Sequence, residues 1–343
     1  MKKLYFASDY MEGAHEKILD RLYELNDVKS VGYGLDDYSE CARGKIRAAC
    51  AAPEADIFFL AGGTQSNAVV IDSILRPYQG VIAADTGHIT THEAGAIEYG
   101  GHKVLSVPHT NGKLTAGDVA ACMDTYLNDD NHDHIVMPGM VYISQPTEYG
   151  TLYSLSELST LSDICRKHSL PLYLDGARLA YALACKENDV TLPDIAHLTD
   201  AFYIGGTKCG TLFGEAVVFP KKDYVPHFFT MMKQHGALLA KGFVTGLQFD
   251  TLFTDDLYFK IGQNAIDTAE TIRQALREKG YRFAFETPTN QIFIVLDKEK
   301  LAYLNERVVM GFWEKPDEDH TVMRIATSWA TTAEDVNKLI ALL

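Results

Sequence analysis

The sequence predicts an α/β protein: a large domain with a mainly parallel sheet flanked by helices, followed by a smaller C-terminal α+β domain. Up to about residue 250, short apolar runs alternate with helical patterns, which is typical of βαβ units. Beyond that point, a long helical stretch precedes two strand-like runs and a closing helix. We expect residues 26–250 to form the large domain, and residues 251–343 to form the small domain together with the N-terminal segment 1–25.

The strands expected in the large domain are short apolar runs, most of which end at a glycine or a polar residue. Between two of these runs, Ser154 and Glu157 have the spacing of a capping box, which predicts a helix to about His168. A second apolar-periodic stretch follows Thr64 and reaches Leu75. The expected strands cover residues 57–60, 81–84, 104–107, 141–144, 172–175, 202–204 and 216–219.

The small domain is expected to open with a helix over residues 261–279, which Gly280 ends. Two apolar runs, 292–296 and 322–326, are the expected strands, and Thr332 is placed to cap a last helix that reaches Leu342.

Composition excludes several classes of protein. The chain has 343 residues, 47% of them hydrophobic, and a net charge of −15, which argues against nucleic acid or an anionic membrane as the main partner. No apolar run approaches the roughly 18 residues of a membrane span, and we expect no secretory leader. The six cysteines form no C-x-x-C pair, so we expect reduced thiols and a cytoplasmic location.

Chemically active residues follow the ends of several expected strands. In an open parallel sheet, ligands bind beyond the carboxyl ends of the strands, so we expect these residues to converge at one edge. They are Gly62-Gly63-Thr64-Gln65, Asp85-Thr86-Gly87-His88, Gln145, Asp175-Gly176-Ala177-Arg178 and Gly205-Gly206-Thr207-Lys208.

Each of these segments has a structural and a chemical interpretation. Glycines at a strand–helix turn serve tight turns, but they also expose N–H groups to a phosphate at the helix N-terminus. Asp175 ends an apolar strand and needs a cationic partner, either nearby Arg178 or a protonated pyridine nitrogen. Lys208 is either a surface residue or a desolvated amine that attacks an aldehyde. Together these groups are the parts of a site for pyridoxal 5′-phosphate (PLP).

Four segments also carry a resemblance to a known family, and they span most of the chain. With them, the sequence resembles the threonine aldolase and β-eliminating lyase family of PLP-dependent enzymes, which implies the PLP-transferase-like, aspartate-aminotransferase-like fold (fold type I). The segments are Gly62-Gly63-Thr64-Gln65-Ser66-Asn67, His88 with Glu93-Ala94-Gly95-Ala96, Leu174-Asp175-Gly176-Ala177-Arg178-Leu179, and the segment around Lys208.

The resemblance implies a role for each candidate residue. Gly63, Thr64 and Gln65 would hold the phosphate, and His88 would stack on the pyridine ring and take part in catalysis. Asp175 would pair with the ring nitrogen, Lys208 would bind the cofactor aldehyde covalently, and Thr207 would contact the cofactor beside it. Arg178 would lie near the ring oxygen or the substrate carboxylate, and Ser8 and Arg324 would bind that carboxylate.

The resemblance further implies a homodimer or homotetramer with its sites at the subunit interface. Tyr33-Gly34 and the stretch around Lys241 match regions that reach a neighbouring subunit's site in the family. The arginine that the family lends to a neighbour's phosphate is missing near Leu238-Leu239, where Lys233 or Lys241 are the candidate substitutes.

The segment after the expected strand 141–144 departs from the family pattern. It reads Ser144-Gln145-Pro146-Thr147-Glu148, without the histidine that threonine aldolases usually have there. Either Glu148 replaces that histidine or the aldol step is altered. His92 stands where the family often has an aromatic residue.

The activity implied is cleavage of threonine or allo-threonine, an amino-acid substrate, to glycine and an aldehyde, with His88, His92 or a water molecule as base. β-Elimination or racemisation at the same site, and a non-catalytic sensor on this fold, are the alternatives.

No metal is expected, because His88 and His92 lack a complete ligand set. Gly32-Tyr33-Gly34 lacks the third glycine of a dinucleotide-binding fingerprint, which argues against a dehydrogenase. Trp313 and Trp329 have no evident role beyond packing.

Overall fold

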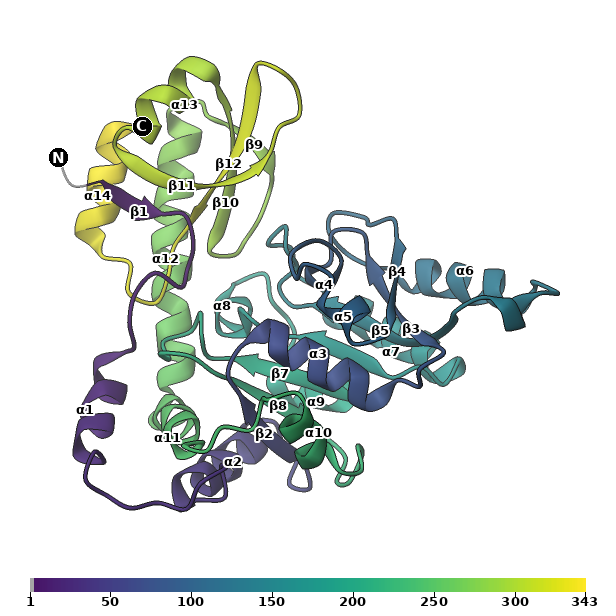
Figure 1. Ribbon diagram of the computed structural model, residues 1–343. Coiled ribbons are helices and arrows are strands. Elements are labelled where there is room, and N and C mark those ends of the chain that lie inside the picture. Colours follow the sequence, from purple (N-terminus) through teal and green to yellow (C-terminus); the bar gives the residue numbers. More distant parts are fainter. Residues whose placement is uncertain (1–2) are drawn as a thin grey trace.

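The computed structural model describes residues 3–343 and contains two β-sheets (Figure 1). The seven-stranded sheet has the order β2-β8-β7-β6-β5-β3-β4 and contains all seven strands expected for the large domain. Their bounds are β2 (Asp56–Leu60), β3 (Gln79–Ala84), β4 (Lys103–Val107), β5 (Met137–Ser144), β6 (Leu172–Asp175), β7 (Ala201–Gly205) and β8 (Glu215–Phe219).

Most neighbours in this sheet run parallel, as the sequence predicts, and β8 is the exception. It lies antiparallel to both β2 and β7, because the short connection 206–214 leaves no room for a crossover helix. Strands β5 and β6 end level with each other, since Ser144 pairs with Asp175. Residues that follow these strands therefore meet at one edge of the sheet.

Helices cover both faces of the sheet, and side chains alternate between two cores. Val81 and Ala83 of β3 belong to the core beneath α3, α5 and α10, whereas Ile82 and Ala84 belong to the core on the opposite face. The helices of this part are α2 (Asp37–Ala49), α3 (Gly63–Ile74), α4 (His88–Thr91), α5 (Ala96–Tyr99), α6 (Ala116–Leu127), α7 (Leu155–Lys167), α8 (Leu179–Ala184), α9 (Leu192–Leu198), α10 (Phe228–Gln234) and α11 (Phe243–Leu252), with a short 3-10 turn at His132–His134.

The sequence signals for two helix starts are confirmed. Helix α7 begins after Ser154, whose side chain accepts from the N–H of Glu157 while the Glu157 carboxylate accepts from the Ser154 N–H. Thr332 caps α14 (Ala333–Leu342) by accepting from the Asp335 N–H.

The five-stranded sheet has the order β1-β11-β12-β10-β9 and has its own core. Its strands are β1 (Leu4–Phe6), β9 (Arg282–Phe285), β10 (Gln291–Asp297), β11 (Val308–Glu314) and β12 (His320–Ala326), and its helices are α13 (Lys298–Asn305) and α14. The sequence predicted β10 and β12 but missed β1, β9 and β11. Strands β1 and β9 are short edge strands and β11 lies beside β1, and all three are less fully buried than β10.

Helix α12 (Leu257–Glu278) links the two parts of the molecule (Figure 1). It contacts α8 near its start, where a Cβ at Gly262 would lie 2.3 Å from the carbonyl oxygen of Ala180, and it contacts α14 and β10 further along. The N-terminal segment is divided between the two parts, because β1 pairs with β11 whereas α1 (Glu16–Glu24) packs on α11. Within residues 3–343, none of the helices combines the length and the apolar character that a membrane crossing requires.

Candidate active site

A cavity of about 660 Å³ lies at the carboxyl ends of the parallel strands and is also lined by β11 and β12 of the other sheet. Seven of the residues predicted for the site line it: Gly63, Thr64, His88, Arg178, Thr207, Lys208 and Arg324. The other three, Ser8, Gln65 and Asp175, do not line it. Residues from both sheets thus enclose one space.

The N-terminus of α3 faces this cavity with free main-chain donors. Its N-cap, Gly62, has no side chain to cap the helix, and Gly63 and Thr64 at the first two helical positions line the cavity. A Cβ at Gly63 would lie 3.0 Å from the hydroxyl oxygen of Tyr203, so the absence of a side chain keeps this turn open. The side chain of Gln65 points back to accept from the N–H of Ala61, at 3.2 Å. The geometry suits an anion at the helix N-terminus.

Asp175 lies just behind the cavity wall and is held as a carboxylate. Its oxygens accept from the hydroxyls of Tyr203 (2.5 Å) and Tyr142 (2.6 Å), from Nδ2 of Asn67 (3.2 Å) and from the N–H of Ala177 (2.9 Å). Burial raises the pKa of Asp175, but the nearby His88 and the two tyrosine hydroxyls outweigh burial, so the net pKa is lowered. The tyrosines were not predicted from the sequence, because in strands they look like ordinary core residues.

His88 begins α4 on the same wall as Glu148. Its main-chain N–H donates to Oε1 of Glu148 at 3.0 Å, and its ring lies 5.4 Å from that of His92. Burial lowers the pKa of His88 to about 4, although the carboxylate of Asp175 acts in the opposite direction. The imidazole is therefore neutral at neutral pH, which suits stacking on a flat ring.

Lys208 follows a closely packed glycine pair. A Cβ at Gly205 would lie 2.3 Å from the carbonyl oxygen of Ala177, and one at Gly206 would lie 2.5 Å from that of Gly214. The lysine Nζ lies 5.9 Å from the centroid of the Tyr10 ring, and within residues 3–343 no acidic group forms an ion pair with it. A half-buried amine without a counterion is suited to covalent chemistry.

The two arginines of the site differ in how their charge is compensated. Arg178 makes a bidentate ion pair with the buried Asp9, at 2.6 and 3.0 Å, and the Arg178 charge holds the pKa of Asp9 at about 2 although burial alone would raise it. Arg324 bonds only to neutral oxygens, those of Gln291 and the Ala7 carbonyl. Its Nε is buried with no partner among the described residues. Of the two arginines, Arg324 is therefore the one without an anionic partner in the described part of the chain.

Three buried glutamates surround this region. Burial raises the pKa of Glu93, Glu148 and Glu215 to about 7 in each case. Glu148 and Glu215 line the cavity, whereas Glu93 bonds Asn67 behind it. Glu148 was a candidate from the sequence. Glu215 was not, because it is the first residue of the otherwise apolar strand β8.

Aromatic side chains of β11 and its neighbours close the outer wall. Trp313 lies 6.0 Å from His92 and 5.9 Å from Tyr149, and the guanidinium of Arg324 lies 5.8 Å from its ring centroid. Trp313, for which only packing was expected, packs against Phe293 and also lines the cavity. Its strand is far from the others in sequence, so no local pattern places it there.

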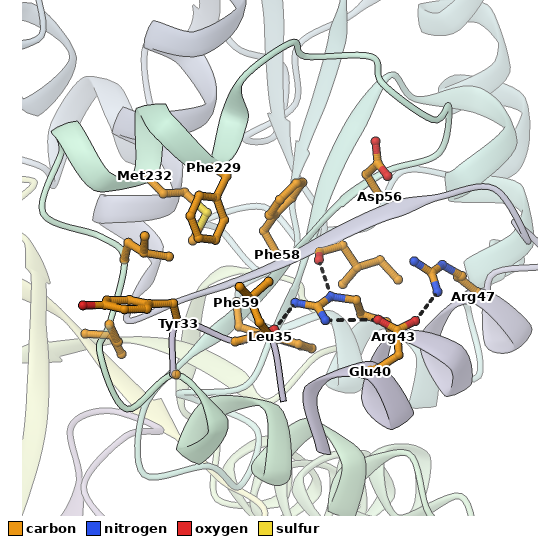
Figure 2. A pocket seen from close by; sticks show the side chains of 15 residues that line it. Tyr33, Leu35, Glu40, Arg43, Arg47, Asp56, Phe58, Phe59, Phe229 and Met232 are labelled. Atoms are coloured by element: carbon orange, nitrogen blue, oxygen red, sulfur yellow. Dashed lines mark hydrogen bonds and ion pairs between the residues drawn. The ribbon is translucent and has the colours of Figure 1, made fainter. Parts of the chain in front are cut away.

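A second hollow, of about 220 Å³, lies beside α2 and α10 (Figure 2). Figure 2 shows Tyr33 and Phe229 on its apolar side and Arg43 on the other, with hydrogen bonds to the main chain and to Glu40. Tyr33 and Leu35 in this wall are exposed. The two hollows have no lining residue in common.

The fold and the site define a class of protein. The chain belongs to the β-eliminating lyase family, whose model matches residues 6–299. It is similar to a low specificity L-threonine aldolase of Pseudomonas aeruginosa, at 28% identity over 97% of this chain and 95% of that protein. The structure of Leishmania major threonine aldolase is 41% identical, has a TM-score of 0.95, and covers 99% of this chain and 98% of that chain.

A more distant likeness bears on the fold alone. Aspartate aminotransferase from Thermus thermophilus shares 14% identity with a TM-score of 0.71, and the match covers 99% of this chain and 90% of that chain. The family and the aspartate-aminotransferase-like fold that the sequence predicts are therefore confirmed.

Proposed function

We propose that the protein is a PLP-dependent lyase that cleaves a β-hydroxy-α-amino acid, threonine or allo-threonine, to glycine and an aldehyde. One observation carries the proposal: the cavity holds both Lys208 and Arg324, and neither cation forms an ion pair with an acidic group among residues 3–343. An amine for covalent attachment and a cation for a carboxylate are what an amino-acid substrate of such an enzyme requires. Similarity to threonine aldolases over nearly the whole chain supports the reaction type.

The residues present fit PLP. The uncapped start of α3 offers N–H groups to a phosphate, Asp175 supplies a carboxylate held in its charged form, and Lys208 supplies an unpaired amine. When bound, PLP supplies an aldehyde that links to amines and a ring that accepts electrons. We assign the phosphate to the main chain of Gly63, Thr64 and Gln65, the ring to His88 and Asp175, and further cofactor contacts to Thr207 and Arg178.

Arg324 is assigned to the substrate carboxylate. Its Nη1 donates to the side chain of Gln291 and its Nη2 donates to the carbonyl of Ala7, which fixes the guanidinium and leaves its charge for an anion in the cavity. Fixing the carboxylate orients the substrate, and orientation decides which bond at Cα is aligned for cleavage. Ser8, which lies between Ala7 and Asp9, is proposed to assist, and Arg178 contributes a charge that Asp9 has largely compensated.

Product analysis tests this function. PLP-loaded protein is expected to release acetaldehyde and glycine from L-threonine or L-allo-threonine. Ammonia with a keto acid from serine, and no aldehyde from either threonine, would instead identify a β-eliminating lyase. Interconversion of D- and L-amino acids would identify a racemase, and the absence of all turnover would identify a sensor.

A homodimer or homotetramer with sites at the subunit interface is part of the proposal. Its support is the exposed apolar surface at the second hollow, where the lining residues Tyr33 and Leu35 are 43% and 63% exposed. Lys233 borders this surface, because its Nζ lies 5.1 Å from the Tyr33 ring centroid, and Lys241 directly precedes the lining residue Gly242 in sequence. Sedimentation analysis is expected to give twice or four times the mass of one chain, and a monomer would overturn this part.

We also propose a division into two domains and a cytoplasmic location. We assign residues 26–250 to the large domain, and residues 251–343 with 1–25 to the small one, supported by β1 in the five-stranded sheet. Limited proteolysis that cuts first in the exposed segments 26–29 and 254–256 would agree with this division. The six free cysteines support a cytoplasmic location, which fractionation of cells tests.

A further inference from the structure

Glu148 lies in a turn that is held rigidly after β5. Gln145 clamps the turn through two hydrogen bonds to the main chain of Tyr153, at 3.1 and 2.9 Å, and the N–H of Thr147 donates to the carbonyl of Thr151. The Glu148 side chain is 8% exposed and lines the main cavity. A buried carboxyl group is therefore presented to the cavity from a fixed backbone.

The two oxygens of this carboxyl group have different surroundings. Oε1 accepts from the main-chain N–H of His88 at 3.0 Å and from the hydroxyl of Ser144 at 2.8 Å. Both of these hydrogen bonds reach the same oxygen, and within residues 3–343 no hydrogen bond from another residue reaches Oε2, which is left for a group in the cavity. Two donors fix the orientation of the carboxyl plane without using the second oxygen.

No lysine, arginine or histidine within residues 3–343 forms an ion pair with Glu148. Burial and the nearby Asp175 raise the pKa of Glu148 to about 7, so the group exchanges its proton near neutrality. The ionisable groups around it are Asp175 on β6, His88 at the start of α4, Tyr142 on β5, and Tyr149 and Tyr153 on its own turn.

The other ionisable groups of the cavity are less suited to accept a proton there. The pKa of His88 is about 4, so its ring is a weak base, and His92 is exposed. Glu215 lies at the start of β8 beside Lys208, where it accepts from the N–H of Gly206. Glu148 combines a fixed carboxyl group, a free oxygen and a position on the His88 wall.

We propose that Glu148 is the base that accepts the β-hydroxyl proton of the substrate, through Oε2. The O–H bond breaks and its proton moves to Glu148, while its electron pair forms the C=O bond of the departing aldehyde. The Cα–Cβ bond breaks, its electron pair stays with the glycine carbon, and a proton returns to that carbon. Atoms and charge then balance as amino acid in, glycine and aldehyde out. This inference rests on the proposed lyase function.

Glu148→Gln is the decisive variant, because its amide oxygen still accepts from His88 and Ser144 but takes up no proton. We expect turnover of threonine to fall by about 10²–10⁴-fold, as for loss of a general base. The visible absorption of bound PLP and the affinity for glycine, which has no hydroxyl to deprotonate, are expected to stay within threefold. Glu98→Gln, at an exposed glutamate of α5, is the matched control and should keep wild-type turnover.

A second readout does not depend on activity. Infrared difference spectra of the glycine-bound protein between pH 6 and pH 8 should show a carboxyl group losing its proton. The signal should be smaller in Glu148→Gln by the contribution of one group. In wild type, turnover should rise with pH through about 7, because the base must be ionised, and the variant's residual turnover should lose this rise.

Three outcomes would overturn the inference. If Glu148→Gln keeps more than a tenth of wild-type turnover, Glu148 is not the base, and the proposed lyase function is unaffected. Loss of PLP or glycine binding in this variant would assign Glu148 a structural role instead. Wild-type protein that binds PLP and glycine but releases no aldehyde from any β-hydroxy amino acid would instead show that the proposed function itself fails.

Discussion

The hydroxyl of Tyr203 donates a 2.5 Å hydrogen bond to Oδ1 of Asp175, which links the cavity wall to the acid just behind it. Tyr203 lines the cavity, whereas Asp175 does not. Hydrogen bonds this short between a hydroxyl and a carboxylate are charge-assisted and strong. Tyr203 therefore helps to keep Asp175 ionised inside the protein, where a bound cation can form an ion pair with the carboxylate.

Replacing Tyr203 by phenylalanine tests this contact. The Tyr203→Phe variant is expected to lose about 1.5–3 kcal/mol in the free energy of unfolding, because it deletes a hydrogen bond to a buried charge. Tyr173→Phe is the control, since the Tyr173 hydroxyl donates to the neutral Oδ1 of Asn67, and about 0.5–1.5 kcal/mol is expected there. Urea unfolding of both variants measures the difference. Equal losses would show that the charge on Asp175 does not strengthen the contact.

Lys208→Ala is expected to abolish turnover and the visible absorption of covalently held PLP. The reason is that Nζ of Lys208 is the amine in the cavity without a counterion. Lys221→Ala, at an exposed lysine, should leave both the spectrum and the activity unchanged. Full activity in Lys208→Ala would be incompatible with the assignment.

Arg324→Lys is expected to weaken glycine binding by about 10–100-fold, since an ammonium group cannot replace a planar fork bonded on two sides. The visible PLP spectrum should remain, because Arg324 is assigned to the substrate and not to the cofactor. Spectral titration with glycine measures the affinity. Arg282→Lys, at an exposed position of β9, is the control. Unchanged glycine affinity in Arg324→Lys would place the carboxylate elsewhere.

Asp9→Asn leaves the buried guanidinium of Arg178 without its counterion. Breaking a buried pair in this way is expected to cost about 3–5 kcal/mol in the free energy of unfolding. Glu40→Gln breaks the ion pairs of an exposed carboxylate with Arg43 and Arg47 and should cost about 1 kcal/mol or less. Because the pKa of Asp9 is about 2 in the folded protein, its contribution is present above its ordinary value of 3.8. It should be lost only as the pH falls towards 2.

The pH dependence of the free energy of unfolding should reveal the raised pKa of Glu93. Its pKa is raised to about 7, mainly by burial, so its stabilising contribution is present below its ordinary value of 4.5 and is lost as the pH rises through 7. Glu93→Gln carries no charge, so it should gain stability relative to wild type between pH 5 and pH 8, by roughly 1–3 kcal/mol. Unfolding by urea at both pH values measures this. A difference between the two proteins that does not change with pH would contradict the raised pKa.

Site residues that directly follow strands were predictable from the sequence, because a glycine turn, a histidine or a lysine at a strand end differs clearly from its apolar neighbours. Lys208 and Arg178 were found in this way, and both line the cavity. Contacts between distant segments were not predictable from local patterns. Asp9 meets Arg178 across 169 positions of sequence, and Trp313 reaches the cavity from the other sheet.

Buried polar residues inside strands were also missed. Tyr142 and Tyr203 read as core aromatics, and only the register of β5, β6 and β7 reveals that both hydroxyls meet one carboxylate. Gln65 and Asp175, which are expected to hold the cofactor, are not among the residues that line the cavity. In the structure, the Gln65 side chain bonds Ala61 and Asp175 lies behind the wall, because each satisfies nearby polar groups first.

The most direct test of the account is the visible absorption spectrum of the purified protein with PLP, titrated with glycine, L-threonine and L-allo-threonine. We predict a visible band that shifts when glycine is added, together with aldehyde released from at least one of the two threonines. The absence of any band, even after addition of PLP, would contradict the assignment of Lys208 and of the cofactor itself.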